Sequence, residues 1–493
     1  MGTGHSDDGL GLQVAMDRQT VIGKRVPKLD APEKATGRAV YVHDVRLPGM
    51  LEARILYSRY AHARILNVDV TRAARVPGVK AILTGADTPA TRFGYGKDNT
   101  PLKGGVVRSL RDEVAAVAAV NADAAQEALE LIEVEYEPLP AVFDAEAALR
   151  EDAPHIHPEK GTNLFTTYAY EHGDMEAAES ESQVVLEATY SLPYVAHAAM
   201  ETSVVVAAFD DRGRLTIYSS TQIPFMLQRD LAEVLGLEGS DVRVLQPAIG
   251  GAFGRGLDIY PFEPIAAILA RKSGRPVRIA FSRREEFLAT PVRQPAKVHL
   301  RAGARRDGSL TFREVDALLD IGAYVSWGTV TPLVMMETTA SLYRVPHVRF
   351  RARCVYTNNP VTGAVRGYGN PQSTFFVETM MDRLAEAIGW DPLAFRIHNA
   401  NRPNEETPQG LKITSCGLRE CFDALAARRA ESRKTEDDGR PTEESGPPQA
   451  FLPSSSTLRG TGFAATLNVG GGARIYRSDG CGATVKVDDF GHA

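Results

Sequence analysis

The chain has 493 residues, more than the roughly 100–200 of a typical domain, so two or three domains are expected. Its formal net charge of −6 gives no electrostatic attraction for nucleic acid, which excludes a nucleic-acid-binding role. The sequence has no apolar run of about 18 residues, and residues 1–17 lack the basic start and apolar stretch of a signal peptide, so we expect a cytoplasmic protein without a membrane span.

Residues 20–150 have the pattern of a small α/β domain. Apolar runs at 79–83 and 113–120 predict strands, and so does the alternation of apolar residues with glutamates at 132–136. Between the last two segments, Asp123 and Gln126 have the spacing of a capping box, so we expect a helix to begin at Asp123.

A larger region at 165–410 follows the polar stretch 151–163. It contains predicted strands at 184–190, 204–209, 215–219 and 242–245, and an amphipathic helix over 227–235 that Gly236 should end. The charged, Pro- and Ser-rich segment 427–458 is interpreted as a linker or disordered loop. Strand-like segments at 460–467 and 483–487 make 459–493 the expected start of a further domain.

The four cysteines are Cys354, Cys416, Cys421 and Cys481, and none belongs to a C-x-x-C pair. An iron–sulfur cluster usually takes four thiolates at close spacing, and structural zinc sites show similar clustering. We therefore expect free thiols in a reducing compartment and no direct metal ligand in this chain.

A glycine-rich run, Ile249–Gly256, follows the strand 242–245. Because glycine has no side chain, successive backbone N–H groups can converge there on an anion. The run matches neither the dinucleotide-binding pattern nor the P-loop. A tight turn that serves packing alone remains the alternative.

Two further loops could carry chemistry. In Arg366–Gln372, the guanidinium of Arg366 could contact a polar or anionic group and Tyr368 could stack on a flat molecule, although a surface turn would look similar. At Thr221–Gln222 the glutamine amide could donate to a metal-bound oxygen, although a helix-capping turn would also fit.

The order and spacing of these three motifs resemble those of the molybdopterin-binding subunits of the xanthine dehydrogenase and aldehyde oxidase family. Three more stretches share the resemblance: Ala31–Tyr41 and Ser58–Ile65, which look like the family's α/β hammerhead domain, and His197–Glu201, which is similar to the turn that opens its cofactor domain. The implied fold is a hammerhead domain followed by molybdopterin-binding α+β domains, of which the last is incomplete.

The resemblance also implies a function, the hydroxylation of a substrate carbon at a molybdenum–molybdopterin cofactor, in its plain or cytosine dinucleotide form. Gln222 would bond an oxygen ligand of the metal, Gly251, Phe253 and Gly254 would present backbone amides, and Arg366 would support the site. Electrons would leave to iron–sulfur and FAD partner subunits. The catalytic residue is unknown, because the family's glutamate base falls beyond residue 493, so a second molybdopterin polypeptide could complete the site.

Tyr368 and Leu257 would line the substrate pocket. Purine-oxidising members of the family have glutamate where this chain has Leu257 and arginine near Val334, and carbon monoxide dehydrogenases have a cysteine in the loop that holds Arg366. These departures predict an aromatic, N-heterocyclic or aldehyde substrate. The alternative is a truncated, catalytically incomplete chain that only binds cofactor or partner subunits.

Overall fold

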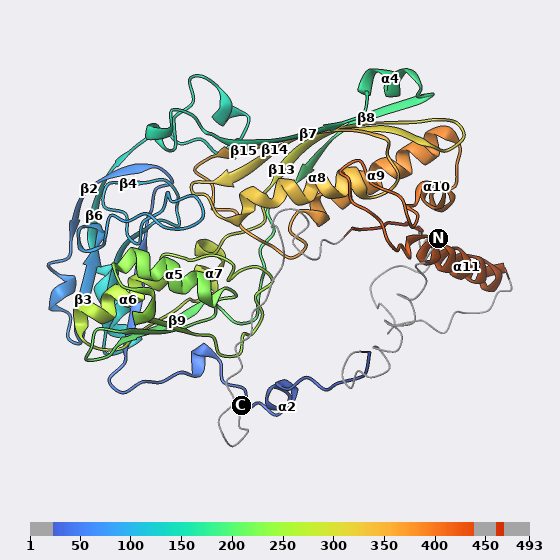
Figure 1. Cartoon of the computed structure of the whole chain (residues 1–493). Helices are drawn as coiled ribbons and strands as arrows, with labels where there is room; N and C mark the ends of the chain where they lie inside the picture. The colour runs from blue at the N-terminus through green and yellow to red at the C-terminus, as the bar shows by residue number, and fades with distance from the viewer. Residues whose placement is uncertain (1–22, 438–459, 468–493) are drawn as a thin grey trace, which may run out of the picture.

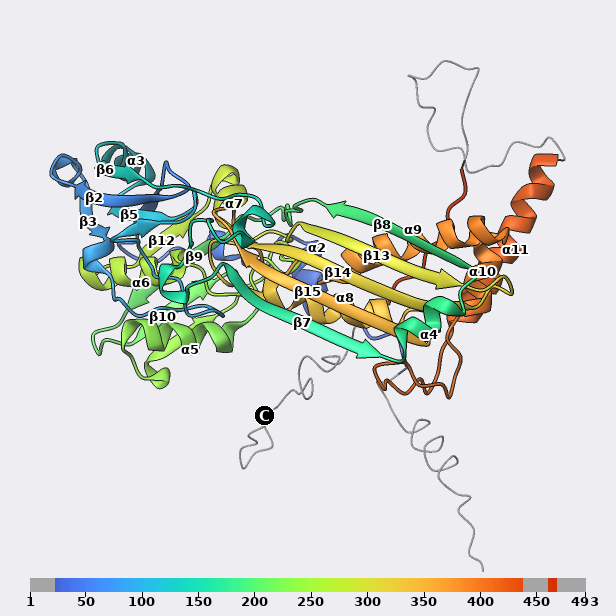
Figure 2. The same ribbon diagram turned by 90° about the horizontal axis from the view of Figure 1, so that it is seen from above.

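The computed structural model describes residues 23–437 and 460–467. These residues form two neighbouring bodies, one built around a seven-stranded sheet and the other around a long five-stranded sheet (Figures 1 and 2). None of the helices in these ranges is long and apolar enough to cross a bilayer.

The seven-stranded sheet has the order β11-β10-β9-β12-β1-β5-β3. Its strands are β1 Leu51–Tyr57, β3 Val79–Thr84, β5 Glu113–Ala119, β9 Val204–Phe209, β10 Leu215–Ser219, β11 Val242–Leu245 and β12 Val277–Ala280. Leu51 of β1 pairs in parallel with Val277 of β12. The segments 20–150 and 165–410, which the sequence divides into separate domains, therefore contribute to one continuous sheet.

Helices cover both faces of this sheet. In β5, Ala116 and Ala118 face the core formed with α5 (Pro224–Leu235) and α6 (Phe262–Ser273), whereas Ala115 and Val117 face α3 (Ala122–Glu130). Burial on both sides explains why β5 is apolar throughout instead of alternating.

The second sheet has the order β7-β15-β14-β13-β8, with β7 Leu164–His172, β8 Val184–Leu192, β13 Ala296–Ala304, β14 Leu310–Gly322 and β15 His347–Tyr356. Helices α8 (Thr331–Ser341) and α9 (Asn370–Ile388) lie along one face, as Figure 1 shows. The opposite face carries charged pairs; Arg349, for example, contacts both Glu171 and Glu314.

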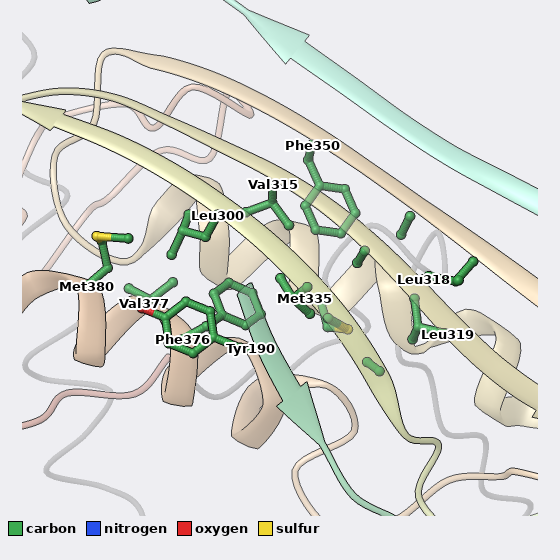
Figure 3. Close-up of a cluster of buried hydrophobic side chains, with 14 of the residues drawn as sticks. Tyr190, Leu300, Val315, Leu318, Leu319, Met335, Phe350, Phe376, Val377 and Met380 are labelled. Atoms are coloured by element: carbon green, nitrogen blue, oxygen red, sulfur yellow. The ribbon is translucent and has the colours of Figure 1, made fainter. Parts of the chain in front are cut away.

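The core between this sheet and α9 fixes the start of that helix. Leu300 and Phe350 of the strands lie in the same buried cluster as Phe376, Val377 and Met380 of α9 (Figure 3). Each of these side chains is fully buried or nearly so. Burying such side chains contributes about 1.5–3 kcal/mol each. The packing of α9 on the sheet therefore holds in place the loop that precedes this helix.

The other elements are shorter. A three-stranded sheet of order β4-β2-β6 consists of β2 Ala63–Asp69, β4 Val106–Val107 and β6 Glu133–Pro138. The remaining helices are α2 Ala31–Ala35, α4 Met175–Ser180, α7 Arg283–Ala289, α10 Pro392–Asn399 and α11 Leu418–Asp437. Single 3-10 turns lie at Val42–Asp44, Ala73–Arg75, Gly85–Asp87, Ala147–Leu149, Pro158–Lys160, Gly239–Asp241 and Trp327–Val330.

The strands predicted at 204–209, 215–219 and 242–245 are confirmed to the residue, and Gly236 ends α5 in the left-handed conformation. The predicted start of α3 is wrong. Its N-cap is Asn121, whose side chain accepts from the backbone N–H of Ala124, so Asp123 already lies inside the first turn. Both side chains can cap a helix, and the residue with extended backbone, Asn121, does so.

Two expectations for the C-terminal part differ from the structure. Helix α11 runs to Asp437 and so includes the first eleven residues of the expected linker, 427–437, because its alanines, arginines and glutamates favour helix. Residues 460–467 form no strand. The strand predicted at 483–487 lies outside the described residues.

Candidate functional site

Gln222 lies in the connection between β10 and α5, where the chain leaves the seven-stranded sheet. Its backbone N–H donates to the carbonyl oxygen of Gly256 at 2.8 Å, and its side-chain Oε1 accepts from the N–H of Gly254 at 2.9 Å. These two bonds join Thr221–Gln222 to the glycine run. Thr221 has the role of the capping alternative, since its hydroxyl accepts from the N–H of Ile223, the N-cap of α5, at 3.1 Å, whereas the side chain of Gln222 bonds to the glycine run.

The glycines of the run are required by close packing and by backbone conformation. A Cβ atom on Gly254, whose φ is +102°, would lie 2.4 Å from the carbonyl oxygen of Ala364. A Cβ atom on Gly256 would lie 2.9 Å from the carbonyl oxygen of Ser220. Close packing therefore requires glycine at these two positions, and the packing brings the motifs together.

Phe253 has the unusual conformation of this run. Its φ is +55°, which is rare for a bulky residue, and its ring is 45% exposed. Backbone strain of this kind costs on the order of 1–3 kcal/mol and gathers at binding sites. The N–H groups of Gly251, Ala252 and Phe253 have no acceptor in the part of the chain that the structure describes. Three such donors around positive φ angles form a nest that fits an anionic or oxygen-rich group.

The loop before α9 lies directly against the glycine run. The N–H of Arg366 donates to the carbonyl oxygen of Phe253 at 2.9 Å, and the exposed guanidinium lies 5.7 Å from the centre of the Phe253 ring. Tyr368 is half-buried with φ +42°, and its hydroxyl donates to the carbonyl oxygen of Trp327. Arg366 thus lies against the glycine run that holds Gly254, and Tyr368 follows two residues later in the same loop.

The turn His197–Glu201 completes this arrangement, which we call the cradle: residues 197–201, 220–222, 250–257 and 364–368. Glu201 accepts from the N–H of Gly250 at 2.6 Å, and Nε2 of His197 donates to the carbonyl oxygen of Ala364 at 2.7 Å. Burial lowers the pKa of His197 despite that bond, so its imidazole is neutral at pH 7.

The sequence analysis did not identify Arg255, a buried arginine of the cradle. Arg255 is 1% exposed and donates to the backbone oxygen of Glu201 at 2.6 Å and to Oε1 of Glu286 at 3.1 Å. Breaking a buried ion pair costs about 3–5 kcal/mol, so this pair holds the glycine run to α7. The position of an arginine inside a glycine run was a sequence signal that could have identified Arg255. No sequence signal pointed to Glu286.

The residues considered for substrate contact in the sequence differ in their burial. Leu257 is half-buried at the end of the cradle's glycine run, with its N–H bonded to the carbonyl oxygen of Gly254. Val334 is 2% exposed in α8. Asp258 is buried, and its carboxylate accepts from the N–H of Ile259. Burial raises the pKa of Asp258 to about 7, although the hydrogen bond from the N–H of Ile259 opposes the shift.

The described residues hold no group of three His, Cys, Asp or Glu side chains that could bind a metal ion. Cys354 is free and buried, and burial raises the pKa of its thiol to about 12, which leaves it unreactive. Within the described residues, the groups of the cradle that are free to bind a ligand are the backbone amides of residues 251–253 and the side-chain Nε2 of Gln222.

Residues 36–140 match the aldehyde oxidase and xanthine dehydrogenase a/b hammerhead domain, and residues 156–400 match the molybdopterin cofactor-binding domain. The chain is 37% identical over 417 residues to the nicotinate dehydrogenase large molybdopterin subunit of Eubacterium barkeri, covering 83% of this chain and 97% of that one. It belongs to the molybdopterin-binding subunits of the xanthine dehydrogenase and aldehyde oxidase family.

Other members of the family are longer than this chain. The xanthine dehydrogenase molybdenum-binding subunit of Escherichia coli O157:H7 is 36% identical over 80% of this chain and 54% of that one. The aldehyde oxidoreductase of Desulfovibrio gigas superimposes with a TM-score of 0.79 at 30% identity, over 84% of this chain and 47% of that one. The quinoline 2-oxidoreductase of Pseudomonas putida 86 has a TM-score of 0.78 at 27% identity, over 85% of this chain and 56% of that one. This molybdopterin subunit thus spans about half the length of these three relatives.

Proposed function

We propose that this chain is the cofactor-bearing part of a molybdenum hydroxylase that oxidises an aromatic, N-heterocyclic or aldehyde substrate. The observation that carries the proposal is the hydrogen bond from the N–H of Gly254 to the side chain of Gln222. It brings two segments separated by 32 residues to one point, where the exposed Arg366 and the nest of amides also lie.

The same bond assigns the orientation of the glutamine amide. Because Oε1 of Gln222 accepts from Gly254, its Nε2 group is left to donate, and an oxygen ligand of molybdenum is a suitable acceptor. The amides of Gly251 and Phe253 would hold the cofactor beside it, and Arg366 would add positive charge. The amide of Gly254, expected to do the same, already donates to Gln222, so Gly254 would instead keep the loops in contact. The cofactor supplies the redox chemistry, and these residues bind and orient it.

The substrate would lie against Tyr368 and Leu257. The bond from the Tyr368 hydroxyl to Trp327 fixes the position of the ring, so a flat substrate would stack on a surface that is already ordered. Leu257 offers no polar group, which favours substrates with few polar edges at that side.

Other polypeptide surface would complete the site. Around the cradle, Met200 is 92% exposed, Phe225 83% and Phe253 45%, which is unusual for large apolar side chains. We propose that a second molybdopterin-binding chain or domain covers this rim and brings the glutamate base. Iron–sulfur and FAD subunits would accept the electrons in the cytoplasm, and the cofactor would be the cytosine dinucleotide form.

The test is to purify the complex from its native host and to measure molybdenum, pterin and nucleotide per chain. One molybdenum and one pterin per chain, with cytidine monophosphate released on hydrolysis, are expected. A complex that contains iron–sulfur and FAD subunits but neither molybdenum nor pterin would favour the alternative of a chain that only binds partner subunits.

A further inference from the structure

An arginine-lined cavity lies outside the cradle, on the face of the seven-stranded sheet that is opposite α6. Its volume is about 740 Å³, and it opens between the segment 46–50 and the start of α3. The charged side chains that line it are Arg46, Glu52, Arg54 and Arg278. We call it the arginine cavity.

Strand geometry explains why these side chains meet. Side chains alternate between the faces of a strand, so Glu52 and Arg54 of β1 point to the same side. Glu52 is in register with Arg278 of the neighbouring strand β12, which places all three on one surface. The buried residues between them, Ala53 and Ile279, pack in the core on the other side of the sheet.

The charges in the cavity do not balance. Arg278 lies 3.3 Å from the carboxylate of Glu52. Arg46 donates to the backbone oxygen of His43 at 2.6 Å, and Arg54 donates to that of Ala280 at 2.9 Å. A carbonyl group satisfies a donor but cancels no charge, so three guanidiniums face one carboxylate among the lining residues.

The environment of Arg278 shows the effect of this excess. Its buried Nε has no hydrogen-bond partner within the described parts of the chain. Burial lowers its pKa, and the charges of Arg46 and Arg54 lower it further, against the opposing effects of Glu52 and of Asp44, which lies outside the lining. A buried guanidinium with an incomplete set of partners is costly, and the negative charge of an anion in the cavity would stabilise it.

The start of α3 adds to the positive character. Asn121 and Ala122 line the cavity, and the side chain of Asn121 is already bonded to the N–H of Ala124. The N-terminus of this nine-residue helix carries partial positive charge and free N–H donors, which favour anions. The second, independent feature is the set of three arginines on the neighbouring strands and loop.

We propose that the arginine cavity binds a small anion that carries a phosphate group. A phosphate carries a charge of about −1.5 to −2 at neutral pH, so it would offset the charge of the three guanidiniums more fully than a single carboxylate would. Guanidinium groups bind phosphate oxygens in pairs, so three of them can hold one tetrahedral group.

The site is distinct from the cradle but adjoins it. Arg283, which follows the cavity residue Ser282, donates to the backbone oxygens of Ala199 and Met200, both at 2.7 Å. The anion would therefore lie behind the turn that carries Glu201, where it would stabilise the cradle without touching the cofactor.

Isothermal titration of the purified full chain tests the proposal, with inorganic phosphate, adenosine monophosphate and acetate as separate ligands. One site per chain for phosphate or the monoester is expected, with much weaker binding of acetate. Comparison of the dissociation constants of inorganic phosphate and adenosine monophosphate shows whether the site prefers a free ion or a phosphate ester. Binding of acetate as tight as that of phosphate, or no saturable phosphate binding at millimolar concentration, would overturn the proposal.

Three variants locate the site. The double variant Arg46→Gln and Arg54→Gln should bind at least about tenfold more weakly, because two charge-assisted bonds are lost. Glu52→Gln should bind more tightly, since the competing carboxylate is removed, and a misfolded protein would not show this gain. Arg243→Gln, on the exposed edge strand β11 of the same sheet, is the control and should bind like the parent. Equal binding by the double variant and the parent would contradict the assignment, as would weaker binding by Glu52→Gln.

Discussion

The side-chain oxygen of Gln222 accepts a hydrogen bond from the backbone N–H of Gly254 at 2.9 Å. An acceptor fixed in this way leaves the amide nitrogen as the outward-facing donor. The bond therefore decides both the shape of the cradle and the polarity that it presents to a cofactor.

The substitution Gln222→Glu separates these two roles. The carboxylate that replaces the amide could still accept from Gly254, so we expect the melting temperature to stay near that of the parent. It could not donate to an oxygen ligand, so kcat/KM should fall about 10- to 100-fold, the effect of losing a bond worth about 1.5–3 kcal/mol. Gln126→Glu, on the exposed surface of α3, is the matched control. An unchanged kcat/KM with normal molybdenum content would show that Gln222 serves loop packing alone.

Gly254→Val should lower the molybdenum content of the complex sharply. The new side chain would lie against the carbonyl oxygen of Ala364 and would occupy a backbone conformation that branched residues avoid, so two loops of the cradle must separate. The control is Gly213→Val, which has φ +77° in a turn with open space around its Cβ position and tests the backbone cost alone. Metal analysis and thermal unfolding of both variants distinguish the cases. Full molybdenum occupancy in Gly254→Val would contradict the site.

The complete enzyme should prefer an apolar aromatic compound, an N-heterocycle or an aldehyde to xanthine or hypoxanthine. An unmatched polar group in a dry pocket costs about 1–3 kcal/mol, and Leu257 offers no partner for a purine edge. The measurement is kcat/KM for xanthine against a panel of such compounds. Leu257→Glu should raise the relative activity on hypoxanthine. Xanthine as the best substrate of the parent would show that another part of the complex supplies the purine-binding groups.

Stability should fall as the pH rises from about 5 to 8. Burial raises the pKa of Asp258 and of Glu263 to about 7. A carboxyl group with a higher pKa in the folded state binds more protons there, so its stabilising effect is complete below the unfolded pKa of about 4 and is lost as the pH rises toward the folded pKa. Urea unfolding of Asp258→Asn and Glu263→Gln should show a smaller pH dependence than the parent. Asp123→Asn, at an exposed position, should keep the slope of the parent.

Local structure was predictable where one sequence signal acts alone. Strand β10 is predicted to the residue, and Gly236 marks the end of α5 because only the left-handed conformation closes that helix. The start of α3 was not predictable in the same way, since Asn121 and Asp123 are both good caps and only the backbone conformation chooses between them.

Long-range features had no local signal. The pairing of β1 with β12 depends on the packing of both domains, and no sequence pattern near Leu51 or Val277 predicts it. The cradle was inferable only because its motifs resemble a known family in order and spacing. The bonds that join them, such as that from Arg255 to the backbone oxygen of Glu201, involve residues whose types are common everywhere in the chain.

The parallel pairing of β1 with β12 also sets the order of events in folding. The side chain of Arg54 reaches the backbone of Ala280 across 226 residues of sequence, a loop whose closure must precede the central contacts of the sheet. Sheets of such high contact order form slowly. The cradle lies at the ends of β10 and β11 in that sheet, so the nascent front half of the chain has no cofactor site. The complete cofactor site therefore requires synthesis of the chain at least as far as the loop before α9, because that loop supplies Arg366 and the carbonyl group of Ala364.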